Sequence, residues 1–342
     1  MEPGFVDAIL LLLIFMAGML VTVWLYRRKR QVASPSINRK RGLVYFLKLA
    51  GFAALSLVMV IFGVMVFIGY QNILEDTRPA PSQVEIPDGL PFEVQEVTFP
   101  GGEGFRMAGW YIPPGNGVTI ILLHGFGSNR TEMLWHAQVL IDAGYGILMY
   151  DERATGESEG NRRSYGWEDP ADVGGALDYL NGLPGTDADK IGIGGCSIGG
   201  QIALQGAAYY PQIGAVWADG SAAITTRDLK GPLNWYTVIG TPANYLLDWI
   251  TAKKLGIDIP PAMIDIIGRI EPRPVMLVSG GKSLPLTGSE SIYLEHFVEH
   301  AGLNTQLWVI PEALHCDGPA WRPEEYADKL VGFFDNAFGV KR

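Results

Sequence analysis

A serine between glycines carries the clearest chemical signal in this chain of 342 residues. Residues 191–200 read IGIGGCSIGG, in which the stretch from Gly195 to Gly199 matches the pattern G-x-S-x-G. A β-branched run precedes the pattern and Ala- and Leu-containing helical sequence follows it, so we expect strand, tight turn and helix in that order. Such a turn exposes the serine hydroxyl above a sheet, and the two glycines allow neighbouring segments to pass close to it. The pattern therefore predicts that Ser197 is a nucleophile.

A glycine-rich loop could supply the electrostatic half of the same chemistry. Residues 122–127 read LLHGFG and follow an apolar run that is typical of a buried strand. In acyl transfer, two backbone N–H groups stabilise the developing oxyanion, and losing one such donor costs about 3–4 kcal/mol. We expect the amides of Phe126 and Ile198 to be these donors. His124 and Gly125 are expected to shape the loop, the histidine through hydrogen bonds and without a part in proton transfer.

A serine hydroxyl needs a base within hydrogen-bond reach, and five histidines are available. His315 follows the last predicted strand, on a loop at the same sheet edge, and is the expected base. His136 lies on a predicted helix beyond the oxyanion loop. His296 and His300 are spaced i, i+4 with Glu299 between them, but no third ligand with clear spacing accompanies them. We therefore predict a solvated helix face there, and no metal site.

The order of these motifs resembles that of the α/β-hydrolase fold over about residues 92–338. The motifs are HGFG at 124–127, DERATGES at 151–158, GCSIG at 195–199, and the late histidine. The second motif resembles a loop that braces the site in this family, with Ala154 in place of the usual glycine. The resemblance implies the chain order nucleophile, acid, base, and a mainly parallel, doubly wound sheet.

The third member of the triad is not fixed by the sequence. Ser283 stands where the resemblance places an aspartate after the seventh strand. Glu290, in the same loop and just before a predicted helix, is the favoured acid. Asp219, at the end of the sixth strand, is the alternative, because some members of the fold supply their acid from there. Either carboxylate could fix the imidazole tautomer and stabilise the imidazolium.

These residues predict cleavage of carboxylic esters through an acyl-enzyme, with no cofactor. Residues from about 221 to 270 are rich in Trp and Tyr and lie where the family inserts caps, so a small or lipid-like ester is the expected substrate. One alternative is a serine peptidase acting on exported peptides. Another is a catalytically silent binding protein of the same fold, an interpretation that the unusual Ser283 favours.

Strand and helix patterns alternate along most of the chain, which predicts a doubly wound, mainly parallel sheet. Strands are expected at 92–99 and 105–112 as an antiparallel pair, and then at 118–123, 146–150, 191–193, 215–218, 275–279 and 306–310. Helices are expected at about 131–143, 169–183, after Ser197, 289–301 and 323–338.

Two long apolar runs near the N-terminus predict a transmembrane hairpin. Residues 5–26 would span about 33 Å as a helix, and residues 43–70 are longer still. The segment 27–41 between them holds seven Lys and Arg and no acid. By the positive-inside rule, this short loop stays in the cytoplasm and both helix ends lead outward.

This topology predicts a two-pass protein of the cell membrane with an extracytoplasmic enzyme. Residues 1–70 form the hairpin, 71–91 a polar, proline-rich stalk, and 92–342 the hydrolase domain. The first 70 residues hold 8 of the 26 Lys and Arg but only 2 of the 36 Asp and Glu, so the remainder is acidic. An acidic outer domain argues against nucleic acid as a partner and against tight binding to anionic lipid, so the lipid bilayer is expected as a partner only through the two N-terminal helices.

The chain has two cysteines, Cys196 and Cys316. A disulfide is permitted outside the cytoplasm. However, one cysteine lies in the predicted elbow and the other follows the predicted base, so their Cα atoms need not come within bonding distance. We therefore expect two buried free thiols.

Overall fold

The computed structural model describes residues 39–184 and 186–341. The chain divides into two units, which are considered one at a time. The first contains the residues up to Asn72 together with Val238–Leu247, and the second contains Ile73–Thr237 and Asp248–Arg342. The first predicted membrane helix, residues 5–26, lies outside the described residues.

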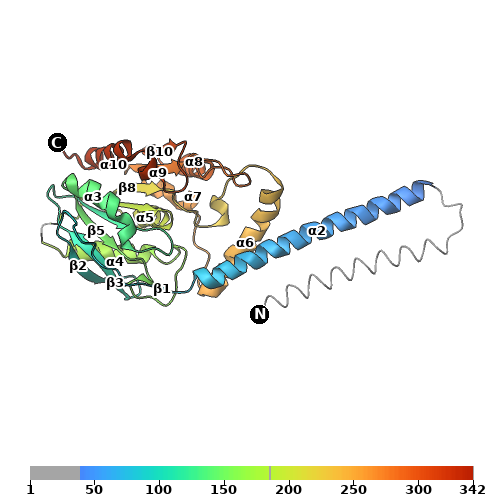
Figure 1. The fold of residues 1–342 in the computed structure, drawn as a ribbon, viewed down its shortest axis with the longest axis horizontal. Helices are drawn as coiled ribbons and strands as arrows, with labels where there is room; N and C mark the ends of the chain where they lie inside the picture. Colours follow the sequence, from blue (N-terminus) through green and yellow to red (C-terminus); the bar gives the residue numbers. More distant parts are fainter. Residues whose placement is uncertain (1–38, 185, 342) are drawn as a thin grey trace. The chain divides into compact units, whose positions relative to one another are not determined.

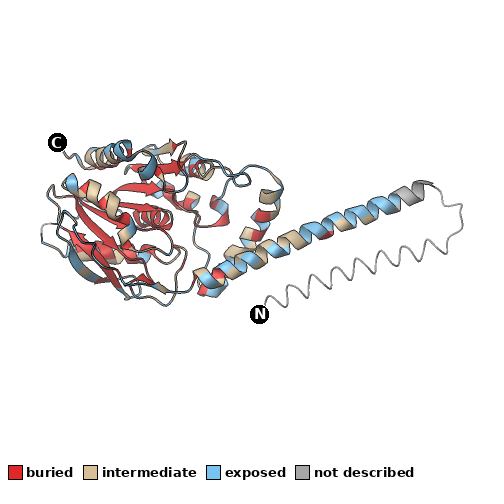
Figure 2. Cartoon of the chain, in the orientation of Figure 1, coloured by how far each residue is buried: buried red, intermediate tan, exposed pale blue. Residues whose placement is uncertain are grey.

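The first unit is dominated by one long helix, α2 (Arg39–Asp76). Its stretch Phe46–Asp76 has a mean hydropathy of 2.6 and is 31 residues long, enough to cross a membrane. Its large apolar side chains are mostly exposed along its length (Figure 2). It is the one helix among the described residues that meets this length and composition, and it contains the second predicted span.

The second unit is built on a sheet of eight strands in the order β10-β9-β8-β7-β4-β5-β3-β2 (Figure 1). The strands are β2 (Gln95–Pro100), β3 (Arg106–Ile112), β4 (Thr119–Leu123), β5 (Gly146–Tyr150), β7 (Ile191–Cys196), β8 (Ile213–Asp219), β9 (Val275–Gly280) and β10 (Thr305–Ile310). The pairs β2–β3 and β3–β5 are antiparallel, and the other neighbours are parallel. The prediction of a mainly parallel sheet with a leading antiparallel pair is confirmed.

Helices cover both faces of this sheet because the central strands are apolar on both sides. In β4, Ile121 and Leu123 belong to one buried cluster, whereas Ile120 and Leu122 belong to the other. The first cluster includes residues of α4 (Pro170–Asn181), α5 (Ile198–Tyr209) and α8 (Ser291–His300), and the second includes residues of α3 (Leu134–Asp142) and α10 (Pro323–Phe338). The sheet is therefore the middle layer of three, with its parallel strands ending at one edge.

The residues expected to form a stalk begin inside α2, which runs to Asp76. After it, β1 (Ala80–Pro81) pairs in parallel with β6 (Thr155–Gly156). Ile73 and Val84 are each only 5% exposed. Val84 belongs to the buried cluster that also contains residues of α3 and α10, so this segment is not a free polar tether.

The insert between β8 and β9 contains α6 (Trp235–Leu255) and shorter helical turns. The side chain of Asn234 accepts hydrogen bonds from two backbone N–H groups at the start of α6, and Gly256 ends the helix with φ 72°. Trp235, Tyr245 and Trp249 on this helix are about half exposed. The expected insert is therefore one capped helix with aromatic side chains on its surface.

Candidate active site

Ser197 occupies a sharp turn between β7 and α5. Its backbone has φ 58° and ψ −118°, a strained conformation for a residue with a side chain. The turn is held from strand β8, because the Ser197 N–H donates to the Asp219 carbonyl (2.8 Å) and the Ser197 carbonyl accepts from the Ala222 N–H (3.0 Å). This is the strand, turn and helix that the sequence predicts for a nucleophile elbow.

The two glycines of the motif are required by close backbone approach. A Cβ at Gly195 would lie 2.3 Å from the Gly199 carbonyl carbon, and a Cβ at Gly199 would lie 2.4 Å from the Leu123 carbonyl oxygen. No side chain fits at either position without moving the backbone.

The two residues whose amides are the predicted oxyanion donors line one small pocket. Ile198 is the first residue of α5, where backbone N–H groups have no partner within the helix. Phe126, in the loop after β4, lines the same small pocket as Ile198. The Phe126 ring stacks on Tyr165 with a centroid distance of 5.3 Å, and the guanidinium of Arg163 lies 4.5 Å from its centroid. The loop is thus fixed by contacts on its aromatic side chain.

His124 is fully buried and has both ring nitrogens engaged. Nε2 accepts from the Glu152 N–H (3.0 Å), so Nδ1 carries the proton and donates to the Gly125 carbonyl (2.7 Å). Burial lowers the pKa of His124. The Gly125 N–H donates to a carboxylate oxygen of Glu132 (2.9 Å). These contacts order the loop and leave the imidazole without a free nitrogen.

His315 and Glu290 form a close pair at the carboxyl edge of the sheet. Nδ1 of His315 donates to Oε2 of Glu290 at 2.6 Å. The other oxygen of Glu290 accepts from the Gly280 N–H at 2.5 Å, which fixes the carboxylate at the end of β9. The hydrogen bond to Glu290 raises the pKa of His315. With Nδ1 bound to a carboxylate, Nε2 is the nitrogen that can accept a proton.

Asp219, the alternative acid, is directed elsewhere. Its carboxylate accepts from the Tyr326 hydroxyl at 2.7 Å, and this hydroxyl accepts from the indole of Trp217 at 2.9 Å. Burial raises the pKa of Asp219 to about 6. The structure therefore brings Glu290, and not Asp219, into hydrogen bonding with His315. Ser283 is exposed in the loop after β9.

The expectation of two free thiols is wrong. Cys196 and Cys316 form a disulfide with a Cα–Cα distance of 6.1 Å. The loop after β10 turns back at Cys316, where φ is 55°, and so reaches β7 across the ends of two intervening strands. The sequence contains a signal for this bond: Cys196 directly precedes Ser197, and Cys316 directly follows His315. If that serine and histidine meet, their neighbours must also be close.

The DERATGES segment is braced by an arginine that the sequence analysis missed. The guanidinium of the buried Arg130 pairs with Asp151 and with Glu157. Asp151 also accepts from the backbone N–H groups of Arg130 and Glu157, each at 2.8 Å. Ala154 has φ 57°, a conformation that favours glycine, the residue that the resemblance implies at this position. These bonds hold the segment next to the loop after β4, where the Glu152 N–H donates to His124.

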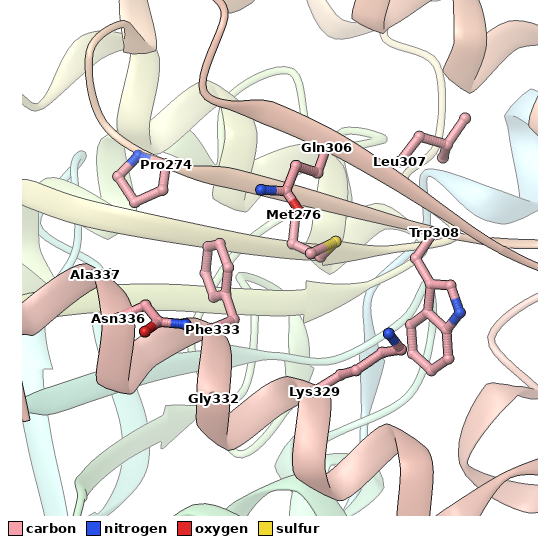
Figure 3. A pocket seen from close by; sticks show the side chains of 10 residues that line it. All are labelled: Pro274, Met276, Gln306, Leu307, Trp308, Lys329, Gly332, Phe333, Asn336 and Ala337. Carbon is pink, nitrogen blue, oxygen red and sulfur yellow. The ribbon is translucent and has the colours of Figure 1, made fainter. Parts of the chain in front are cut away.

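Two other features lie apart from this constellation. A cavity of about 530 Å³ lies between β9, β10 and α10, and its lining includes Met276, Trp308 and Phe333 but none of the predicted site residues (Figure 3). On α8, ligand atoms of His296, Glu299 and His300 lie within 4.8 Å of one another.

The α8 cluster already has cationic partners. The ammonium of Lys230 lies 2.8 Å from a carboxylate oxygen of Glu299, and Nδ1 of His296 lies 2.9 Å from the other oxygen. The Nδ1 of His300 is bonded to the backbone carbonyl of His296 (2.9 Å). The three side chains are thus held together by an ion pair with Lys230 and by hydrogen bonds of the two histidines, and the solvated helix face without a metal stays a prediction.

Comparison with protein families gives a match to the X-Pro dipeptidyl-peptidase (S15 family) model over residues 103–228. The matched segment contains the oxyanion loop, the braced segment and the elbow, and it ends before Glu290 and His315. It covers less than half of the chain.

Curated relatives and solved structures match a longer part. The chain is 31% identical over 214 residues to the uncharacterized protein YqkD of Bacillus subtilis, covering 59% of this chain and 69% of YqkD. It is 25% identical over 264 residues to the uncharacterized protein YfhR of Salmonella typhi, covering 73% and 85%. The Pyrococcus furiosus esterase Pf2001 superposes with a TM-score of 0.59 at 23% identity, covering 75% of this chain and 98% of the esterase. The chain belongs to the same family as YqkD, and its fold is that of the α/β-hydrolases.

Proposed function

We propose that this protein is a membrane-anchored serine hydrolase that cleaves carboxylic esters through an acyl-enzyme on Ser197. The observation that carries the proposal is the hydrogen bond of 2.6 Å between His315 and Glu290, on the same sheet edge as the elbow. An imidazole held by a carboxylate on one nitrogen presents its other nitrogen as a base. The strained turn at Ser197 supplies the nucleophile.

The reaction follows from these positions. Ser197 Oγ attacks the ester carbonyl carbon while Nε2 of His315 takes its proton. Glu290 stabilises the resulting imidazolium, and the amides of Phe126 and Ile198 stabilise the oxyanion. The imidazolium then protonates the leaving alcohol. A water molecule, activated by the same imidazole, releases the acid and restores the serine.

The choice of ester over peptide rests on two supports. Ester cleavage is chemically easier than amide cleavage, and Pf2001, which shares the fold, is an esterase by name. The match to the X-Pro dipeptidyl-peptidase model favours the second candidate, a serine peptidase of the same fold. The exposed aromatic residues of α6 support a small or lipid-like acyl substrate, because a cap of this composition offers apolar contacts.

An extracytoplasmic location is part of the proposal. It is supported by the apolar span within α2 and by the disulfide, because disulfides persist in oxidising compartments. The proposed arrangement is the two-pass hairpin with its basic loop in the cytoplasm. Protease treatment of intact cells should degrade the second unit, and full protection of that unit would overturn this topology.

A fluorophosphonate probe tests the chemistry directly. The wild-type protein should be labelled and Ser197→Ala should not, because the probe reacts with activated serines. Ser283→Ala is the matched control, since Ser283 is exposed and outside the site, and it should be labelled like the wild type. Failure of the folded wild type to react would favour the silent binding protein of this fold.

Substrate class is then decided by turnover. We expect hydrolysis of p-nitrophenyl acyl esters of short and medium chain length, and little release of p-nitroaniline from Xaa-Pro anilides. The reverse preference would replace the esterase by the peptidase.

A further inference from the structure

We infer that the Cys196–Cys316 disulfide is a positioning element of the active site, which holds the base over the nucleophile and makes turnover depend on the oxidised state. The inference rests on the proposed serine hydrolase. Its starting observation is that the bond joins the residue before Ser197 to the residue after His315.

The bond spans the sheet edge on which the site is built. Cys196 is the last residue of β7, and Cys316 lies in the loop after β10, with β8 and β9 between these strands. Ser197 and Cys316 both have positive φ, 58° and 55°, so each segment makes an unfavourable turn next to the bond. Strained turns of this kind persist where the surrounding structure over-determines them, and a covalent link between the two turns does so.

Packing at Gly220 shows how closely the parts converge. A Cβ added at Gly220 would lie 2.8 Å from Nδ1 of His315 and 3.0 Å from Sγ of Cys316. The preceding residue, Asp219, receives the Ser197 N–H on its carbonyl oxygen, and Sγ of Cys316 lies 3.5 Å from the same oxygen. The His315 imidazole, the Cys316 sulfur and the Ser197 turn therefore all lie against the backbone of residues 219–220.

The exposure of His315 suggests why the disulfide would be needed to hold it in place. The side chain of His315 is 51% exposed, in a loop, whereas the side chain of Glu290 is only 12% exposed. A hydrogen bond from an exposed loop leaves rotational and hinge freedom, and misplacing a catalytic group by about 1 Å can cost about 100-fold in rate. The disulfide anchors the loop one residue from the imidazole and so limits this freedom.

The chemistry of the switch is ordinary thiol–disulfide exchange. Dithiothreitol would attack the bond, pass two electrons and two protons to the sulfurs, and leave two cysteine thiols and the cyclic oxidised dithiol. Oxidised glutathione would re-form the protein disulfide and would itself be reduced to two molecules of glutathione. Cys196 is 6% exposed and Cys316 is more accessible, so attack by a thiolate should begin at Cys316.

The test compares the wild type with the double variant Cys196→Ala/Cys316→Ala, in detergent and on the full chain. We expect kcat on p-nitrophenyl esters to fall about 10- to 100-fold in the double variant, with KM changed less than about threefold. Each single variant should lose about as much as the double, because either change removes the same bond. Dithiothreitol should lower the activity of the wild type to the same level, leave the double variant unaffected, and be reversed by oxidised glutathione.

Two measurements separate positioning from general loss of structure. The near-UV and far-UV circular dichroism of the reduced protein should stay native at the assay temperature. The acidic limb of the kcat/KM profile should move to lower pH in the double variant, because a loosened His315 loses its contact with Glu290, whereas Ser283→Ala should keep the wild-type profile. If the double variant does not fold, the reduced wild type under native conditions supplies the same comparison.

The outcomes are distinct. The inference would be overturned, with the proposed hydrolase left intact, if the double variant or the fully reduced wild type kept full kcat. The detection of two free thiols with Ellman's reagent in untreated, denatured protein would overturn it in the same way. A wild type that neither reacts with fluorophosphonate nor hydrolyses esters, with its disulfide intact, would instead overturn the proposed function and this inference with it.

Discussion

Glu290 lies with a carboxylate oxygen 2.6 Å from Nδ1 of His315, although the two residues are separated by 25 positions and stand on loops after different strands. The second oxygen of Glu290 is fixed by the Gly280 N–H. The resemblance implies an aspartate close to the end of β9 as the partner of the histidine. Here Glu290, just before α8, reaches His315 with its longer side chain. The pair supplies the carboxylate of the proposed triad, although Ser283 stands where the resemblance places an aspartate.

Substitutions of Glu290 and Asp219 should show which of the two carboxylates acts with His315. We expect Glu290→Gln to lower kcat by about 10²- to 10⁴-fold, because an amide neither fixes the tautomer nor stabilises the imidazolium. Asp219→Asn, the matched control, should lower kcat less than about 10-fold, since Asp219 bonds to Tyr326. Steady-state kinetics on p-nitrophenyl esters checks both, and the opposite ranking would assign the acid to Asp219.

The pH profile should report the histidine. His315 must be neutral to accept a proton, and Glu290 raises its pKa above the ordinary value of 6.5. The kcat/KM of the wild type should therefore rise with pH and reach half its plateau above pH 6.5. A midpoint at or below 6.5 in a pH series at constant ionic strength would contradict the pairing.

Asp219 should make stability depend on pH. Its pKa is raised from 3.8 to about 6 by burial, so the folded state favours the protonated carboxyl. That contribution to stability is complete below the unfolded pKa and is lost as pH rises through about 6. Asp219→Asn removes this dependence, so the Tm of the variant minus that of the wild type should increase between pH 4 and pH 7. Differential scanning calorimetry measures it, and a constant difference would argue against a protonated Asp219.

The arginine that covers Phe126 should matter for the oxyanion loop. Arg163 donates from Nε to the carbonyl of Arg78 at 2.7 Å and stacks on the Phe126 ring. Arg163→Ala should lower kcat by about 10-fold through a less ordered loop, a fraction of the cost of losing one oxyanion donor. Arg162→Ala is the neighbouring control, because Arg162 pairs with Glu168 and should leave kcat within about twofold. Equal effects of the two substitutions would refute a specific role for Arg163.

Reduction of the disulfide should also lower the global stability. The bond joins positions 120 residues apart, and removing a native disulfide costs roughly 2–5 kcal/mol through the greater freedom of the unfolded chain. Urea unfolding with and without dithiothreitol should show a lower midpoint in the reduced protein. The double cysteine variant should be insensitive to the reductant.

Features set by short-range patterns could be predicted from the sequence. The strand expected at 146–150 is Gly146–Tyr150 in the structure, because an apolar run between turn residues defines a buried strand. The elbow could be predicted from the spacing of Gly195 and Gly199, because both positions lie where backbone segments approach too closely for a Cβ atom. The preference for Glu290 came from its place in the loop after β9, and the structure has it against His315.

Features that depend on the path of loops could not be predicted. The disulfide requires the loop after β10 to turn back over two strands, and no local pattern specifies that turn. The contact of Arg163 with Phe126 likewise joins segments whose separation in the sequence carries no signal. The sequence predicts a stalk at 71–91 because proline and polar residues are frequent there, yet Ile73 and Val84 within this segment are buried.

The ring that the Cys196–Cys316 bond closes contains β8, β9 and β10 and all three residues of the proposed triad, Ser197, Glu290 and His315. A single proteolytic cut between residues 197 and 315 would leave the two pieces covalently joined, and only reduction of the bond would release the piece that carries His315.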